Sequence, residues 1–401
     1  MKRILFISIS APPKSGPESL QTGKYLSELS KYFSIDLVTT ETSSYGWNKV
    51  VGKKELLLMP YINSLIELKG YSNRLFSKIK SWLPKQLKFP DDNFHFHTSA
   101  KHVIKKLENI PDAIYSRSSP LSSSILAFKI KEKINRPWIM HLSDPWVDNP
   151  FLNSNYERNK KWEETCFSSA DIITVTNDNY LTFLKEKYPT YQHKFELSYN
   201  VYEPIKIKPI DFSQPLSLVY FGNFYGDRSP KVIIEAFSRI YNDSPKELDN
   251  VTVSFYGNLD ANSQQIIDNA NLPFVFHKGF IPFSKIVEVV ADSTILINIE
   301  DQFTQLSDIL FLPSKIMDYI SYQRLILSIS SNRSPSRSII NKKYGEVFEH
   351  DNIDGIVKFI KSTIKAYNEK NYDFFQVHEP DPLFSIEFQA RKLMTKILSL
   401  K

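Results

Sequence analysis

An α/β protein of two domains, each built around a parallel β-sheet, is predicted by three features of the sequence. The chain has 401 residues, which exceeds what one hydrophobic core usually organises. Short apolar runs alternate with helical patterns in both halves, as in parallel βα units. A polar, proline-containing segment at 200–215 separates the halves and is typical of an extended linker. We therefore expect a first domain at 1–203, a second at 204–375 and a terminal helical segment at 376–401 that packs back across the domain junction.

The expected strands are short and mostly apolar, as strands covered on both faces are. In the first domain they are 3–9, 35–38, 113–115, 138–141, 172–175 and 195–197. In the second domain they are 216–221, 252–256, 274–276, 295–299, 325–329 and 346–348. The last helix is expected at 385–400.

The composition, with 42% hydrophobic and 23% charged residues, is that of an ordinary globular protein. No apolar run approaches the roughly 18 residues of a transmembrane helix, and the apolar start at 3–9 is too short for a signal peptide. The single Cys166 excludes an internal disulfide framework and fits a reducing compartment. We therefore expect a cytoplasmic protein. The net charge of +6 is modest for this length, and no nucleic-acid partner is expected.

The segment 69–88 concentrates basic residues, and Glu67 is the only acid near it. Its apolar residues repeat at helical spacing, so it predicts a basic amphipathic helix. Such a helix can lie on an anionic membrane surface, which would place the protein at the inner face of the membrane. The alternative is a surface helix that packs its apolar side on its own domain.

Polar side chains follow several strands of the first domain. Because the carboxyl ends of parallel strands open onto the ligand crevice of such sheets, these side chains are expected to face one crevice. They are Arg117, Ser118 and Ser119, then His141 and Asp144. The loop around Gly16, after the first strand, opens onto the same crevice. Asp144 and Pro145 could instead form a turn that caps the next segment. His95 and His97 form a His-x-His pair without an acidic or cysteine partner at ligand spacing, so no metal site is expected.

The loop after the strand 216–221 is a candidate phosphate site. Gly222 and Gly226 let the backbone turn tightly near a ligand, and Arg228 can reach phosphate oxygens at the start of the next helix. The alternative is a plain βα loop with a surface arginine.

The segment 312–324 carries a second candidate anion site. Pro313 and Ser314 stand at a helix start, where free N–H groups and the positive end of the helix dipole suit an anion. Lys315 adds a full charge, and Asp318 lies three residues on, close to the same helical face. This is the chemistry of a nucleoside diphosphate with its ribose. The alternative is an ordinary capped helix that leads into a buried strand.

Taken in order, these stretches resemble the GT-B nucleotide-sugar glycosyltransferases, and specifically the bacterial family-four-like group that builds surface polysaccharides. The resemblance covers nearly the whole chain. Its landmarks are Pro90-Asp91, Ser119-Pro120, Pro137-Trp138-Ile139, Asp144-Pro145-Trp146, the run 170–176, Gly222-Asn223 with Arg228, and Pro313-Ser314-Lys315 with Asp318-Tyr319.

The resemblance implies two facing Rossmann-like domains, with the nucleoside diphosphate sugar donor held mainly by the second. Arg228 and Lys315 would contact the diphosphate and Asp318 the ribose, beside Gly222, Asn223 and Ser314. The loop around Gly16 would approach the donor, and His141 to Asp144 would lie beside the transferred sugar and the acceptor, with Arg117, Ser118 and Ser119 on the acceptor side.

Two departures from the family pattern concern the sugar and the acceptor. The family often has two glutamates separated by seven residues, whereas here the later position is Asp318 and the earlier is Leu310. Asp308, Asp301 or Glu300 could take over recognition of the sugar. Many relatives also place an arginine just before Asp-Pro-Trp, where this chain has Ser143.

The expected function is transfer of a sugar from a nucleoside diphosphate donor to a saccharide or lipid-linked saccharide acceptor in surface polysaccharide synthesis. Lys315 and Arg228 would stabilise the departing diphosphate, so neither a metal nor another cofactor is expected. In retaining transfer, which the family resemblance suggests, the leaving phosphate can take the acceptor proton. In inverting transfer, Asp144 or His141 would be the base. The alternatives are a GT-B-like nucleotide-sugar epimerase and a non-catalytic nucleotide-sugar-binding protein.

Overall fold

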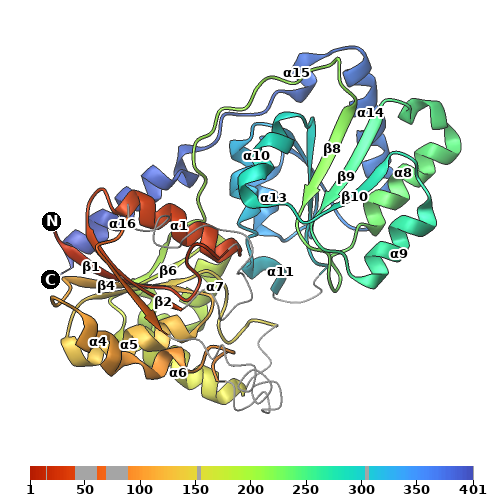
Figure 1. Cartoon of the computed structure of the whole chain (residues 1–401). Coiled ribbons are helices and arrows are strands. Elements are labelled where there is room, and N and C mark those ends of the chain that lie inside the picture. Colours follow the sequence, from red (N-terminus) through yellow and green to blue (C-terminus); the bar gives the residue numbers. More distant parts are fainter. Residues whose placement is uncertain (15, 41–60, 69–88, 151–154, 303–306, 401) are drawn as a thin grey trace. The chain divides into compact units, whose positions relative to one another are not determined.

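The chain forms two compact units in the computed structural model, which describes residues 1–14, 16–40, 61–68, 89–150, 155–302 and 307–400. Unit 1 comprises Met1–Val201 and Pro382–Lys401, and unit 2 comprises Tyr202–Asp381 (Figure 1). The predicted terminal segment 376–401 is therefore divided, since its first residues belong to unit 2 and its helix to unit 1. The predicted basic helix at 69–88 lies outside the described residues.

Unit 1 is built on a seven-stranded parallel sheet with the order β3-β2-β1-β4-β5-β6-β7. Its strands are β1 (Arg3–Ile7), β2 (Ser34–Thr40), β3 (Ser64–Leu68), β4 (Ala113–Ser118), β5 (Trp138–Leu142), β6 (Ile172–Val175) and β7 (Phe195–Leu197). Strand β3 is absent from the predicted set. It is an edge strand of which only Ile66 and Leu68 are buried, so it lacks the continuous apolar run of a covered strand.

Helices cover both faces of the first sheet (Figure 1). Helices α1 (Pro17–Leu29) and α16 (Ile386–Ser399) lie on one face, and α4 (Ala100–Lys106), α5 (Ser122–Ile134) and α6 (Tyr156–Ser169) on the other. Helix α7 (Asp178–Lys187) and the 3-10 turns Phe96–Thr98, Pro189–Lys194 and Pro382–Phe384 complete the unit. Ile386, Ala390 and Leu393 of α16 join the same hydrophobic core as Leu26 and Leu29 of α1. The last helix is thus an integral layer of unit 1.

Unit 2 is built on a six-stranded parallel sheet with the order β10-β9-β8-β11-β12-β13. Its strands are β8 (Leu216–Phe221), β9 (Val251–Tyr256), β10 (Val275–Gly279), β11 (Ile295–Ile299), β12 (Leu325–Ile329) and β13 (Gly345–Phe348). All six overlap predicted runs. Strands β11 and β12 are buried along their whole length, as parallel strands covered on both faces are, whereas the edge strand β10 is largely exposed.

The helices of unit 2 also form two layers around their sheet. Helices α8 (Lys231–Asp243), α9 (Ala261–Ala270) and α14 (Ile353–Asn368) lie on one side, and α10 (Phe283–Ala291) and α13 (Pro335–Ile340) on the other (Figure 1). The short helices α11 (Ser307–Leu310), α12 (Lys315–Ser321) and α15 (Tyr372–Phe375) and a 3-10 turn at Pro245–Leu248 complete the set. Ile233, Phe237, Ile356 and Ile360 from α8 and α14 fill the main core. Among the described residues, no helix is long and apolar enough to span a bilayer.

Each sheet reverses its strand order once, between β1 and β4 in unit 1 and between β8 and β11 in unit 2. In open α/β sheets, ligands bind outside the carboxyl ends of the strands at this point. The loops that follow β1, β4, β8 and β11 are therefore the places to look for function.

Candidate functional site

The cations of unit 2 gather at its reversal point. The ammonium nitrogen of Lys315, at the start of α12, lies 4.4 Å from the ring centroid of Tyr220 in β8 and 5.8 Å from that of Tyr319. This nitrogen is buried and has no hydrogen-bond partner in the described part of the chain. Burial, followed by repulsion from Arg228, lowers the pKa of Lys315 to about 7. A buried amine that lacks an anionic partner is a natural place for an anionic ligand.

Arg228 completes this cationic group from the loop after β8. Its Nη2 donates to Oδ2 of Asp301, just beyond β11, over 2.7 Å, and the guanidinium lies 5.1 Å from the Tyr225 ring centroid. The Nε of Arg228 is buried without a partner in the described residues. Arg228 and Lys315 are thus brought together as predicted. Asp301, predicted on the sugar side, is instead half of an ion pair that orients Arg228.

Glu300 was a candidate replacement for the missing family glutamate, and the structure gives it another role. Its carboxylate accepts hydrogen bonds from Asn298 Nδ2 at 2.9 Å, from Ser334 Oγ at 2.7 Å and from Ser336 Oγ. The side chain is buried and joins β11 to the start of α13. Glu300 is therefore a structural residue, although its charge also favours protonated Lys315.

Two glycines shape the loop after β8. Gly222 has a φ of +147°, and a Cβ there would meet the Tyr220 hydroxyl at 3.0 Å. Gly257 has a φ of +126°, and its Cβ would lie 2.1 Å from the Gly222 carbonyl oxygen. Asn223, predicted to bind the donor, uses its Oδ1 to accept from the Asn258 amide at 2.9 Å. The loops after β8 and β9 are thus held against each other.

Helix α12 is fixed to the sheet by Tyr319. Its hydroxyl donates to the Ile297 carbonyl and accepts from the Phe221 amide, both at 3.2 Å. Ser314 makes no side-chain cap, and the amides of Ile316 and Met317 are taken up by carbonyls three residues back. Two amides of the first turn are thus used within α12 itself, and the expected contact of Ser314 with the donor stays a prediction.

The remaining acidic predictions of unit 2 are Asp318 and Asp308. The charge of Asp318 raises the pKa of Tyr319 and Tyr322, after burial, but it is absent from the charges that act on Lys315. Leu310, at the position of the first family glutamate, is fully buried in α11. The backbone of Asp308 lies in the same helix, and its side chain is outside the description.

Unit 1 carries a network of charged and polar side chains at its own reversal point. The carboxylate of Glu18, in the first turn of α1, accepts from Arg117 Nε at 2.9 Å and Nη2 at 3.4 Å, and from Ser143 Oγ at 2.6 Å. The Arg117 side chain is fully buried, donates to the Tyr115 hydroxyl at 3.3 Å and lies 4.8 Å from the Tyr25 ring centroid. Arg117, which was predicted on the acceptor side, is thus buried and paired with Glu18.

Asp144 follows Ser143 in this network and keeps part of its surface exposed. Desolvation, followed by the negative charge of Glu18, raises the pKa of Asp144 to about 7. The Asp-Pro-Trp loop is anchored by α6, where Asn159 Oδ1 accepts from Trp146 Nε1 at 2.9 Å and Glu163 Oε1 from the Val147 amide at 3.3 Å. A partly accessible carboxyl group that exchanges its proton near neutral pH is suited to acid–base work or to binding hydroxyl groups.

The other predicted residues of unit 1 are mostly enclosed. His141 is fully buried, Thr174 Oγ1 lies 2.9 Å from its Nδ1, and its Nε2 has no partner among the described residues. Burial and the nearby Arg117 lower its pKa well below the usual value, so the ring is neutral. Ser118 Oγ lies 2.5 Å from Ser124 Oγ, a buried hydrogen bond that joins the end of β4 to α5.

Two loop residues complete the predicted set of unit 1. The Ser119 carbonyl accepts from Ser10 Oγ at 3.3 Å, which links the loops after β4 and β1. Gly16 precedes α1 with an extended φ of −75°, and a Cβ there would meet open space. No steric or conformational requirement for glycine therefore exists at this position.

His97 of the His-x-His pair lies beside a lysine. Nδ1 of His97 lies 3.0 Å from the Lys129 ammonium nitrogen. Burial, followed by Lys129, lowers the pKa of His97 to about 4. Within the described ranges, no group of three or more His, Cys, Asp or Glu residues could hold a metal ion.

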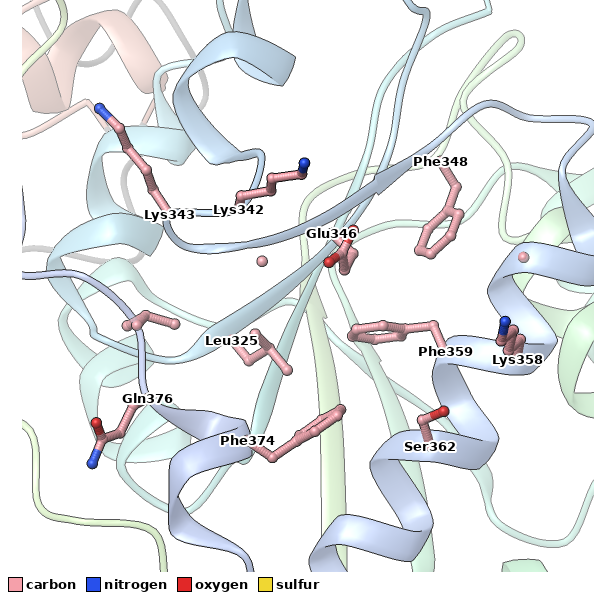
Figure 2. A pocket seen from close by; sticks show the side chains of 13 residues that line it. Leu325, Lys342, Lys343, Glu346, Phe348, Lys358, Phe359, Ser362, Phe374 and Gln376 are labelled. Atoms are coloured by element: carbon pink, nitrogen blue, oxygen red, sulfur yellow. The ribbon is translucent and has the colours of Figure 1, made fainter.

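An open pocket lies elsewhere in unit 2 (Figure 2). It has a volume of about 530 Å³ and runs beside the edge strand β13, between α14 and the segment 374–377. Lysines 342, 343 and 358 and phenylalanines 348, 359 and 374 line it. It contains no predicted site residue.

Sequence reasoning missed three residues of these clusters. Tyr220 and Tyr319, whose rings flank Lys315, look like ordinary core aromatics in the sequence. Glu18 looks like a favourable acid in the first turn of a helix, and the only signal for more was its place just after the loop that follows β1.

Comparison with known proteins supplies structural relatives only. Neither a protein-family model nor a curated protein sequence matches the chain. A glycosyltransferase from Rickettsia africae superposes with a TM-score of 0.65 at 14% identity, covering 99% of both chains. HepE from Anabaena, solved with UDP and glucose, gives 0.63 at 12% identity over 100% of both chains. The apo lipopolysaccharide outer core galactosyltransferase WaaB gives 0.59 at 14% identity over 99% of both.

At these low sequence identities the similarity shows the fold alone. Because the matches cover nearly the whole chain, the shared fold includes both units. The predicted fold class, with two α/β units each built on a parallel sheet, is confirmed. The chain therefore has the GT-B fold of these nucleotide-sugar glycosyltransferases.

Proposed function

We propose that the protein is a glycosyltransferase that uses a nucleoside diphosphate sugar, of the UDP type, as donor. The observation that carries this proposal is the buried ammonium group of Lys315, which has no hydrogen-bond partner in the described residues and lies near a second cation, Arg228. Two cations at the reversal point of a parallel sheet suit a diphosphate. Structural relatives solved with UDP or a UDP-sugar analogue support this donor class.

The reaction breaks the bond between the anomeric carbon of the donor sugar and the β-phosphate oxygen. The electron pair of that bond leaves with the diphosphate, and Lys315 and Arg228 stabilise its growing negative charge. The acceptor hydroxyl oxygen bonds to the anomeric carbon. In the retaining course that we propose, its proton passes to an oxygen of the leaving phosphate. These cations do the work that a metal ion would otherwise do, so we propose transfer without a metal.

We assign the saccharide acceptor, free or lipid-linked, to the polar cluster of unit 1. Asp144 is the one predicted side chain there that is both partly exposed and near its proton-exchange point at neutral pH. Carboxyl groups recognise sugar hydroxyls as acceptors when ionised and also as donors when protonated. Surface polysaccharide synthesis in the cytoplasm remains the setting we propose, in keeping with the relative named as a lipopolysaccharide core galactosyltransferase.

A thermal-shift screen over nucleotides and nucleotide sugars tests the donor site. A bound donor at about 100 times its dissociation constant stabilises the fold by about 2.7 kcal/mol. We expect nucleoside diphosphates and their sugars to raise the melting temperature of the wild type and not of the Lys315→Met variant. No stabilisation by any nucleotide would reject the donor assignment.

Products identify the reaction. The best donor is incubated with saccharide and lipid-linked acceptors in the presence of EDTA. We expect release of nucleoside diphosphate and a product that keeps the anomeric configuration of the donor sugar. A product of inverted configuration would make Asp144 the group that takes the acceptor proton. Isomerised donor in the absence of an acceptor would indicate an epimerase, and binding without turnover a non-catalytic protein.

A further inference from the structure

We propose that Glu18 is a positioning residue that anchors the loop carrying Asp144 and holds a negative charge near its carboxyl group. This inference rests on the proposed function for its meaning, because it names the residue that prepares the acceptor-side carboxyl group. It is tested by a titration that needs neither donor nor acceptor.

The contacts of Glu18 join α1, β4 and the loop after β5 at the carboxyl edge of the first sheet. Its partner Arg117 is the penultimate residue of β4, at a separation of 99 residues, and its partner Ser143 follows β5, at a separation of 125. Ser143 is the immediate neighbour of Asp144. A hydrogen bond of 2.6 Å from Ser143 Oγ to Glu18 Oε2 therefore fixes the backbone from which Asp144 projects.

An acidic residue in the first turn of a helix usually serves the helix itself, through free amides and the dipole. Glu18 differs, because both of its carboxylate oxygens accept hydrogen bonds from side chains of other elements. Arg117 is fully buried, and Glu18 supplies its counter-charge. Loss of one partner of such a pair would leave a buried charge uncompensated. Glu18 is thus fixed by Arg117 and by Ser143.

The carboxyl groups of Glu18 and Asp144 have different surroundings. Glu18 accepts hydrogen bonds from Arg117 and Ser143, whereas burial, followed by the negative charge of Glu18, raises the pKa of Asp144. The other groups that act in this cluster are Tyr180 on α7, whose pKa Asp144 helps to raise, and the neutral His141 in β5. A carboxyl group whose pKa is raised by burial and by a neighbouring negative charge is a recurrent feature of active sites.

The consequence is a carboxyl group that is partly protonated at neutral pH. In its protonated form Asp144 can donate to an acceptor hydroxyl, and in its ionised form it can only accept. Glu18 thereby shifts the balance between the two forms without touching the substrate. Removal of its charge should favour ionised Asp144 and lower the pH at which that group titrates.

The experiment is a carbon-13 titration of the aspartate carboxyl groups in the full chain, with the Asp144 signal assigned by its loss in Asp144→Asn. We expect the wild type to titrate near pH 7 and Glu18→Gln roughly one pH unit lower, as expected for loss of a charge at close range. The control is Glu28→Gln, which removes a charge from the same helix about 15 Å further along its axis. It should leave the Asp144 titration unchanged.

An Asp144 titration that is the same in folded Glu18→Gln and in the wild type would overturn the proposal. Should Glu18→Gln fail to fold, the double variant Glu18→Gln/Arg117→Met removes both buried charges together and avoids an unpaired arginine. Its Asp144 titration is also expected to fall, and an unchanged value there would equally overturn the proposal. Absence of sugar transfer would contradict the proposed function, but it would not change the expected effect of Glu18 on the Asp144 titration.

Discussion

The ammonium nitrogen of Lys315 lies 4.4 Å from the centroid of the Tyr220 ring, buried and without a hydrogen-bond partner in the described residues. The ring face offers partial compensation for the charge, but far less than a phosphate would. The free protein therefore holds this amine at a pKa of about 7. A diphosphate that arrives beside it should raise that pKa again, so that binding and protonation are coupled.

Proton uptake on donor binding is the first prediction. At pH 8 Lys315 is mostly neutral in the free protein, and a bound diphosphate should draw a proton onto it. Calorimetric titration of UDP in two buffers of different ionisation enthalpy should show uptake of up to about one proton. The affinity should fall as the pH rises above 7. Lys315→Met, the control, should show neither effect.

Replacement of Lys315 should stabilise the free protein. Its pKa is lowered in the fold, so between pH 7 and 10.5 the unfolded chain binds more protons and stability rises with pH. Lys315→Met removes both the burial cost and this pH dependence. Denaturant unfolding at pH 7 should show a gain on the order of 2 kcal/mol. A loss of stability would mean that the lysine has a partner in the free protein.

Asp144 makes the opposite contribution to the pH dependence. Its pKa is raised from 3.8 to about 7, so the folded state binds more protons between those values and stability falls as the pH rises through that window. Asp144→Asn should flatten this slope and be more stable than the wild type at pH 8. Thermal melts between pH 4.5 and 8 measure it, with Asp318→Asn as a control of equal charge change. Equal slopes in wild type and Asp144→Asn would refute the raised pKa.

Two glycine substitutions should differ sharply. Gly257→Ala places a Cβ 2.1 Å from the Gly222 carbonyl oxygen at a φ of +126°, and should cost at least about 2 kcal/mol. Gly16→Ala puts a methyl group into open space with an extended backbone, and should be nearly neutral for stability. Chemical denaturation compares the two. Equal stabilities would show that the loops after β8 and β9 are not packed as described.

The fold could be predicted from the sequence because its strands are covered on both faces. Runs such as 216–221 and 325–329 stand out as continuous apolar segments between polar turns, and they match β8 and β12. Strand β3 could not be found in this way. It lies at a sheet edge, where three of its five residues remain partly exposed and Glu67 interrupts the apolar pattern.

The sequence could predict only those parts of the candidate site that follow from the order of the strands along the chain. Arg228 lies in the loop after β8, and Lys315 begins α12 between the neighbouring strands β11 and β12, so the topology of one sheet brings them together. The pairing of Glu18 with Arg117 spans 99 residues and leaves no local pattern. The hydrogen bonds that the amides of Ile316 and Met317 make within the first turn of α12 leave no such pattern either. Side-chain partners of this kind depend on three-dimensional packing.

The central claim is that Arg228 and Lys315 bind a diphosphate, and calorimetric titration of UDP and of uridine into wild type and Arg228→Gln tests it most directly. Loss of a charge-assisted hydrogen bond of about 1.5–3 kcal/mol should weaken UDP binding by roughly 10- to 150-fold. Uridine lacks the diphosphate, so its affinity should not change. Equal affinities of the two proteins for UDP, or a parallel loss for uridine, would contradict the account.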